Sequence, residues 1–296
     1  MTLNKLYGLK KYFLNLTQLF ETNKLPKVLM FTGKKGQGKF TLTHHLIAFI
    51  FDKNNYDLRD GSIKEKNILN NNIKENYNPN VIYFNCSNNN VKIDDIRNLR
   101  LNLQKSSINS MNRYIIFDDV ECLNENCVNA LLKNIEEPSD TNFFILINNQ
   151  SKIILDTLKS RAIEIMFFLN NAEKIDIIKQ LLKDYPIEEK IELANTTLTP
   201  GNYFKYNKII LNDKIDVNND LIFNIEKLLR LSKLRKNIDY VNFAIYLINE
   251  HFINKSKKKL NISYYNNRIN IIKKLHEMSK LNLNQANLIL EIENYI

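Results

Sequence analysis

The chain has 296 residues, too many for one ordinary core, so its length predicts two or three domains. Only six glycines and five prolines are present, which argues against long flexible linkers and favours a largely helical chain. The net charge of +10 favours encounters with phosphate polyanions, although lysine is also simply a common exposed residue here.

The cysteines and the hydropathy pattern narrow the class of protein further. Cys86, Cys122 and Cys127 form no CxxC pair, so they supply neither a zinc ligand set nor a disulfide framework. They suit buried thiols in a reducing cytosol. The first residues lack the apolar core of a signal peptide, and no run approaches the ~20 apolar residues of a membrane span. We therefore expect a cytoplasmic protein.

The first part of the chain alternates helical and strand patterns. Apolar residues three or four apart predict an amphipathic helix over residues 3–23. A short apolar strand over 27–32, a glycine-rich turn and a helix over 40–51 follow. Beyond them lie a polar insertion with some helix at 52–80, strands at 81–86, 113–117, 142–147 and 163–168, and helices at 93–104 and 126–136. This alternation predicts a parallel sheet with helices on both faces.

Strand patterns stop after Leu169. The remaining chain predicts helices at 172–183 and 187–196, a break at Thr199-Pro200-Gly201, and four amphipathic helical stretches between 220 and 296. The predicted plan is an α/β domain over residues 1–168, a small helical lid over 169–210 and a helical C-terminal domain over 211–296.

A phosphate-binding motif stands between the first strand and the next helix. The run GKKGQGK carries Gly33, Gly36, Gly38 and Lys39 in the pattern GxxxxGK, and the strand–loop–helix context makes that match credible. Glycines let the backbone curl so that several N–H groups point at phosphate oxygens. The lysine supplies a cation for the β- and γ-phosphates. The loop predicts a nucleotide site, or a turn that keeps the fold but holds nucleotide weakly or not at all.

The residues that would place Mg²⁺ depart from this pattern. The motif ends in Ser or Thr, whose hydroxyl ligates the metal, but Phe40 offers no oxygen, and Thr41 is rotated by ~100° around the helix. Asp118 follows a buried strand, where a metal-binding carboxylate is expected. Asp119 is one methylene shorter than the Glu that usually comes next, and such a displacement lowers rates. Alone, these carboxylates could also be only a turn and helix cap.

Four segments in order resemble the bacterial clamp-loader subunits and their eukaryotic replication factor C relatives. They are GKKGQGK, RYIIFDDVECLNENCVNALLKNIEEP, NFFILINNQSKII and LKSRA. Residues 129–138 (NALLKNIEEP) resemble the family's NALLKxLEEP, the most specific match, and the resemblance covers residues 3–168. It implies an α/β AAA+ core, a parallel sheet flanked by helices, followed by an all-α lid and an all-α C-terminal collar domain.

The resemblance also implies roles for single residues. Ser160 and Arg161 stand in the family's SRC motif, with Ala162 in place of Cys. There the arginine reaches the ATP of a neighbouring subunit and acts as an arginine finger in trans. Asn148 would be sensor 1, and Asn202 stands where the family's sensor-2 arginine contacts phosphate.

Together, the departures at Phe40, Asp119 and Asn202 predict a subunit whose own ATPase activity is weak or absent. ATP is compatible with the loop, but Phe40 opposes Mg²⁺. Many relatives carry a cysteine zinc module in the region that matches 52–86, where only Cys86 falls, so we expect no zinc.

The implied partners are the tau/gamma and delta subunits, primer–template DNA through backbone contacts, and the sliding clamp through the complex. Two alternatives stay open at this point. The chain could be an active motor ATPase of the tau/gamma type, against which Phe40 argues. It could also be an AAA+ replication initiator that binds specific DNA, but its terminal helices are too apolar and poor in arginine for a recognition helix.

Overall fold

The computed structural model describes residues 4–69, 78–87, 90–103, 111–194, 196–217, 219–258, 262–281 and 285–295. The chain divides into two compact units. The first comprises Met1–Pro186 and Ala194–Tyr203, and the second comprises Ile187–Leu193 and Phe204–Ile296. The predicted three-part division at residues 168 and 210 stays a prediction.

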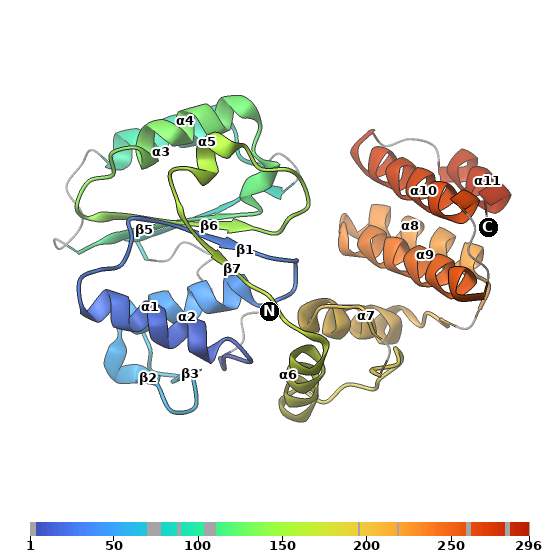
Figure 1. Cartoon of the computed structure of the whole chain (residues 1–296), viewed down its shortest axis with the longest axis horizontal. Helices are drawn as coiled ribbons and strands as arrows, with labels where there is room; N and C mark the ends of the chain where they lie inside the picture. The colour runs from blue at the N-terminus through green and yellow to red at the C-terminus, as the bar shows by residue number, and fades with distance from the viewer. Residues whose placement is uncertain are drawn as a thin grey trace. The chain divides into compact units, whose positions relative to one another are not determined.

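A five-stranded parallel sheet forms the centre of the first unit (Figure 1). Its order is β4-β5-β6-β1-β7. The strands are β1 (Val28–Thr32), β4 (Val81–Asn85), β5 (Arg113–Asp118), β6 (Asn142–Asn148) and β7 (Ile163–Met166). All five predicted strands and their parallel arrangement are therefore confirmed.

Helices cover both faces of this sheet, as the alternation of elements predicted (Figure 1). On one face lie α1 (Lys10–Glu21) and α2 (Lys39–Phe51), and on the other lie α3 (Ile93–Leu103), α4 (Glu125–Ile135) and α5 (Asp156–Lys159). Strand side chains alternate between the two cores: Leu29 and Phe31 pack on the side of α1 and α2, whereas Val28 and Met30 pack on the opposite side. Because both faces of the central strands β1, β5 and β6 are buried, these three strands read as nearly continuous apolar runs.

The N-terminal helix begins at Lys10, so the prediction of a helix from residue 3 was wrong at that end. Gly8 has a φ of 70°, a left-handed conformation that interrupts a helix. Leu6 is nevertheless buried, because its side chain belongs to the same hydrophobic core as Ile63. Its backbone N–H bonds to Gly61 O at 2.9 Å in the turn between β2 (Tyr56–Asp57) and β3 (Ser62–Ile63). The helix-like spacing of Leu6 and Leu9 therefore reflects their burial in the tertiary structure and not a helix. Residues 1–3 lie outside the described residues.

The predicted helix at 187–196 was also wrong over its described residues, which form no helix. The buried Asn207 side chain accepts hydrogen bonds from the backbone N–H groups of Lys190 (2.7 Å) and Ile191 (3.2 Å). The Asn207 oxygen thus satisfies two backbone N–H groups that have no helical partner. Pro200, expected at a break, instead starts α7 (Pro200–Asp213), because the first helical position tolerates proline. The preceding helix α6 (Asn171–Asp184) matches its prediction.

Four helices build most of the second unit and confirm the four predicted stretches. They are α8 (Leu221–Arg235), α9 (Asp239–Lys258), α10 (Ile262–Leu281) and α11 (Gln285–Tyr295). Helix α9 packs on α8 and α10, and α11 packs on α10 and α8, so the contacts close a ring. The side chains of Leu228, Phe243, Leu275 and Ile292 are buried, one from each helix. Over the described part of the chain, no helix has both the length and the apolar character to cross a membrane.

Replacing Asn207 with Ala should lower the free energy of unfolding by about 1 kcal/mol, because two partly buried backbone donors of residues 190 and 191 lose their acceptor. Asn212 is exposed on the same helix, so Asn212→Ala is the matched control and should change stability little. Urea denaturation of both variants measures the difference. Equal effects would contradict the role of Asn207.

Candidate functional site

The candidate site lies where three neighbouring strands end. Because β5, β6 and β1 are parallel and adjacent, their carboxyl ends place Asp118, Asn148 and Thr32 at one edge of the sheet. The glycine loop follows Thr32 directly, and its Gly33 N–H bonds to Asn148 O at 3.1 Å. Ligands of open α/β sheets bind at such an edge. The fold therefore brings together the glycine loop, the candidate metal-binding residue Asp118 and the candidate sensor Asn148.

Two glycines set the shape of the loop. Gly36 and Gly38 have φ values of 87° and 91°, in the left-handed region that other residues rarely adopt. A Cβ on Gly36 would also lie 2.3 Å from Thr199 Oγ1. The loop thus has the curled backbone that the sequence predicted, and α2 begins immediately after it at Lys39.

Lys39 is turned into the loop. Its side chain is only 2% exposed, and Nζ donates to the carbonyl oxygens of Gly33 (2.6 Å) and Lys34 (2.9 Å). Burial lowers the pKa of Lys39 to about 8, while the nearby carboxylates of Asp118 and Glu121 oppose that shift. The ammonium that a phosphate-binding loop presents to its ligand is here bonded to the loop itself.

The position expected to hold Mg²⁺ carries an aromatic pair. The Tyr83 hydroxyl donates to Asp118 Oδ2 at 3.1 Å, and the ring of Phe40 packs edge-on against Tyr83, with centroids 5.5 Å apart. Burial, together with the charge of Asp118, raises the pKa of Tyr83, so its hydroxyl remains a donor. The other carboxylate oxygen, Oδ1, accepts from the backbone N–H of Asp119 at 3.1 Å. Thr41 is half-buried one position beyond Phe40 on α2.

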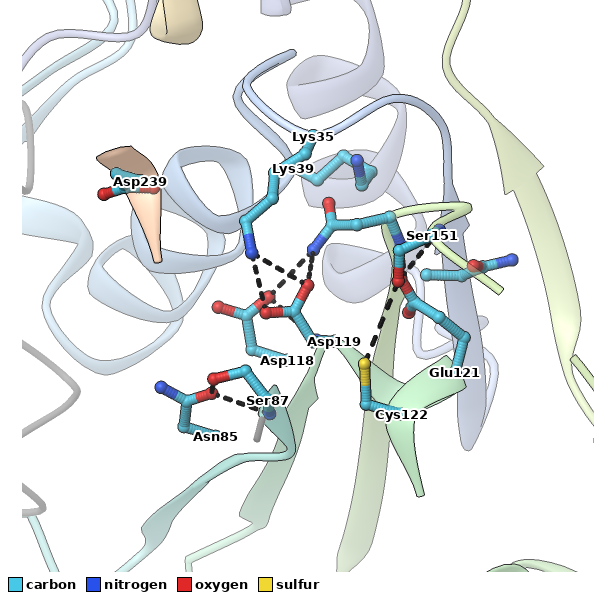
Figure 2. A network of polar contacts seen from close by, with 12 residues as sticks. Lys35, Lys39, Asn85, Ser87, Asp118, Asp119, Glu121, Cys122, Ser151 and Asp239 are labelled. Carbon is cyan, nitrogen blue, oxygen red and sulfur yellow. Dashed lines mark hydrogen bonds and ion pairs between the residues drawn. The ribbon is translucent and has the colours of Figure 1, made fainter. Parts of the chain in front are cut away.

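Asp119 is buried and paired with the glycine loop (Figure 2). Lys35 Nζ lies 2.9 Å from Asp119 Oδ2, and Asn149 Nδ2 donates to Oδ1 at 2.7 Å. The backbone of Asp119 has a φ of 57°, which aspartate tolerates better than most residues. Sequence reasoning predicted Asp119 but missed Lys35 and Asn149, because Lys35 occupies a variable position of the glycine motif and Asn149 stands one residue beyond the expected sensor.

Glu121 anchors the loop that follows β6. Its carboxylate is buried and accepts from the backbone N–H groups of Asn149 (3.1 Å) and Ser151 (3.2 Å) and from the Ser151 hydroxyl (2.7 Å). The predicted sensor Asn148 lies beside it, buried, with Nδ2 3.4 Å from Thr32 Oγ1 and Oδ1 accepting from Gln150 N. Sequence reasoning missed Glu121, whose signal was only an acidic residue after the strand end.

The start of α7 is fastened to the same loop. The Thr199 hydroxyl donates to Lys35 O at 2.7 Å, and the Gly201 N–H donates to Gly36 O at 2.9 Å. Asn202 Nδ2 lies 3.4 Å from Lys35 O, so the residue at the expected sensor-2 position lies near the phosphate loop. These contacts lie within one compact unit. Through them, the carbonyl oxygens of Lys35 and Gly36 accept hydrogen bonds from the start of α7.

Arg161 and Ser160 belong to a separate group of contacts at the end of α5. Arg161 Nη2 lies 2.7 Å from Glu136 Oε1, and its Nη1 donates to Thr157 O at 3.0 Å. The Ser160 hydroxyl also donates to Thr157 O, at 3.1 Å. The Arg161 side chain is 35% exposed and that of Glu136 is 47% exposed. The structure therefore places Arg161 at the surface, paired with Glu136, the last residue of the helix predicted over 126–136.

Among the described residues, no group of three or more His, Cys, Asp or Glu side chains is arranged to hold a metal ion. Cys86 and Cys127 are buried and Cys122 is half-buried, and burial raises the pKa of all three thiols. These thiols have the low reactivity of structural cysteines. The expectation of no zinc stays a prediction.

A family model described as "DNA polymerase III, delta subunit" matches residues 8–170. The chain is 30% identical over 104 residues to DNA polymerase III subunit delta' of Pseudomonas aeruginosa, a match that covers 35% of this chain and 32% of that protein. It is 27% identical over 143 residues to the Bacillus subtilis subunit of the same name, covering 48% and 42%. These matches therefore span less than half of the relatives' length.

Among solved structures, a DNA polymerase III gamma subunit-related protein of Thermotoga maritima is similar over 95% of this chain and 99% of that chain, with 15% identity and a TM-score of 0.50. At this identity the similarity concerns the fold alone.

The shifted pKa of Lys39 makes stability depend on pH. Below pH 8 the ammonium is charged in both folded and unfolded chains, so the cost of burying it is fully present. Between about 8 and the ordinary value of 10.5, only the unfolded chain binds the proton, so stability rises with pH. Relative to Lys39→Met, the wild type should gain about 1 kcal/mol per pH unit in this window, measured by urea denaturation. A difference that stays constant with pH would contradict the buried ammonium.

Proposed function

Because the chain belongs to the DNA polymerase III delta subunit family and its first unit has the AAA+ fold, we propose that it is a delta-prime-type subunit of a clamp loader. In this role it helps place the sliding clamp on primed DNA. It supplies Arg161 to the ATP site of a neighbouring subunit, while its own ATP site is degenerate.

The main support for a degenerate ATP site is that both carboxylates at the end of β5, Asp118 and Asp119, already bond to other side chains. Asp118 accepts from the Tyr83 hydroxyl, and Asp119 is ion-paired with Lys35. Mg²⁺ demands near-octahedral oxygen ligands and gives up its water reluctantly. Phe40 offers it no oxygen, and the ring of Phe40 supports the tyrosine that already bonds to Asp118. This arrangement supports weak or absent ATP hydrolysis in the chain's own site.

The position of Arg161 supports the finger role. A half-exposed ion pair such as Arg161–Glu136 contributes only about 0–1 kcal/mol, so the guanidinium is not committed to a fold-stabilising contact. Guanidinium is planar, always charged and able to fork across phosphate oxygens. An arginine of this kind at the surface can reach a phosphate on another polypeptide. The Ser160 hydroxyl bonds to the same turn and helps to fix its shape.

The rest of the chain provides the partner contacts of the proposal. The second unit, a closed helical bundle, would join a collar with the tau/gamma and delta subunits. The net charge of +10 suits contact with the phosphate backbone of primer–template DNA without reading of bases. The sliding clamp would be engaged through the assembled complex.

An active motor of the tau/gamma type is the second candidate, because the glycine loop and Lys39 are in place. Calorimetric titration with ATP, with and without Mg²⁺, separates the two. We expect that Mg²⁺ does not tighten ATP binding by the isolated chain. The double variant Phe40→Thr/Tyr83→Phe provides a hydroxyl and removes the phenol donor, so Mg²⁺ should tighten its binding by about tenfold, or about 1.4 kcal/mol. Mg²⁺-dependent binding and turnover by the wild type would favour the motor.

The finger role predicts a defect in trans. In a complex reconstituted with the other loader subunits, Arg161→Ala should lower DNA-dependent ATP hydrolysis at the site it completes by roughly 10³-fold, with assembly intact. Arg97→Ala is the matched control, because Arg97 is also an exposed, ion-paired arginine, bonded to Asp94. ATPase assays and size-exclusion chromatography measure both effects. Clamp loading at the wild-type rate by the Arg161→Ala complex would refute the role.

A further inference from the structure

Glu136 and Arg161 are distant in sequence but joined in space. Glu136 is the C-cap residue that directly follows α4, and Arg161 follows the short helix α5. Arg161 Nε donates to Glu136 Oε1 at 2.9 Å, and Nη2 lies 2.7 Å from the same oxygen. Nη1 donates to Thr157 O at 3.0 Å and lies 3.4 Å from Ser160 Oγ. All three guanidinium nitrogens therefore have protein partners, which fix the plane of the group.

This fixation leaves donor capacity for a ligand. The Nε and Nη2 groups share one carboxylate oxygen, so Glu136 lies along the side edge of the guanidinium. Nη2 carries two N–H groups, and its contact with Glu136 uses one of them. The second can donate to a phosphate oxygen while the first remains on Glu136. The carboxylate and a phosphate can thus bind the same guanidinium together.

Holding the side chain in advance favours catalysis. A long, half-exposed arginine samples many rotamers, and ordering it at the moment of phosphate contact costs free energy. An arginine already held in one orientation avoids most of that cost. The pair is half-exposed, so it contributes little to folding stability. Its effect on rate should therefore be separable from any effect on folding.

We propose that Glu136 is a positioning residue that orients Arg161 toward the phosphates of an ATP bound to a neighbouring subunit. This role rests on the proposed function, because it requires Arg161 to act in trans. Glu136 does not touch the nucleotide, and it acts only through the guanidinium.

The test uses the reconstituted clamp-loader complex with Glu136→Ala, Glu136→Gln and Glu137→Gln. Glu137 is an exposed neighbour that serves as the matched control. Glu136→Ala should lower kcat of the DNA-dependent ATPase by about tenfold with KM for ATP unchanged, since a misplaced catalytic group loses rate rather than affinity. Glu136→Gln keeps one acceptor oxygen and should fall between Ala and wild type. Glu137→Gln should match the wild type, and the Tm of the isolated chain should stay the same in all three.

Arg161→Ala in the same complex separates the two possible failures. If Arg161→Ala leaves the ATPase rate unchanged, the proposed function fails and the positioning role fails with it. If Arg161→Ala lowers the rate but Glu136→Ala does not, only the positioning role is overturned. The double variant should be no slower than Arg161→Ala alone, because Glu136 acts through Arg161. A further loss in the double variant would overturn the positioning role too.

Discussion

The parallel pairing of β5, β6 and β1 is the constraint on which the candidate site depends. Parallel neighbours end at the same edge of the sheet, so Asp118, Asn148 and the glycine loop meet although they are far apart in sequence. The two helical layers bury both faces of these strands and fix their register. Gly36 and Gly38 then allow the loop after β1 to curl over that edge.

The polar groups at this edge have mostly found partners within the protein. Buried charges require compensation, and Lys39, Asp119 and Glu121 are all nearly inaccessible to solvent. Lys39 is compensated by loop carbonyls, Asp119 by Lys35 and Asn149, and Glu121 by two backbone amides and a hydroxyl. A nucleotide with its metal would have to displace several of these bonds. This cost is the physical basis of the degenerate site that we propose.

Arg161, in contrast to these buried charges, is partly exposed to solvent. Arg161 and Glu136 remain partly in water, where an ion pair contributes little to folding stability. The same chain thus combines a polar site closed by its own side chains with a cation at the surface. That contrast is what a subunit needs if it acts on a neighbour's ATP without hydrolysing its own.

Local patterns in the sequence determined the five strands of the parallel sheet, most of the helices and the glycine loop, since periodicity and turn residues act over a few positions. They missed the β2–β3 hairpin, which lies in the segment predicted as a polar insertion with some helix. They failed at residues 4–9, where burial against a hairpin imitated helical spacing, and at 187–194, where Asn207 satisfies the backbone instead. They also could not reveal the pairs Lys35–Asp119, Tyr83–Asp118 and Arg161–Glu136. Each joins residues far apart in the chain, so only the tertiary path of the backbone decides which donor meets which acceptor.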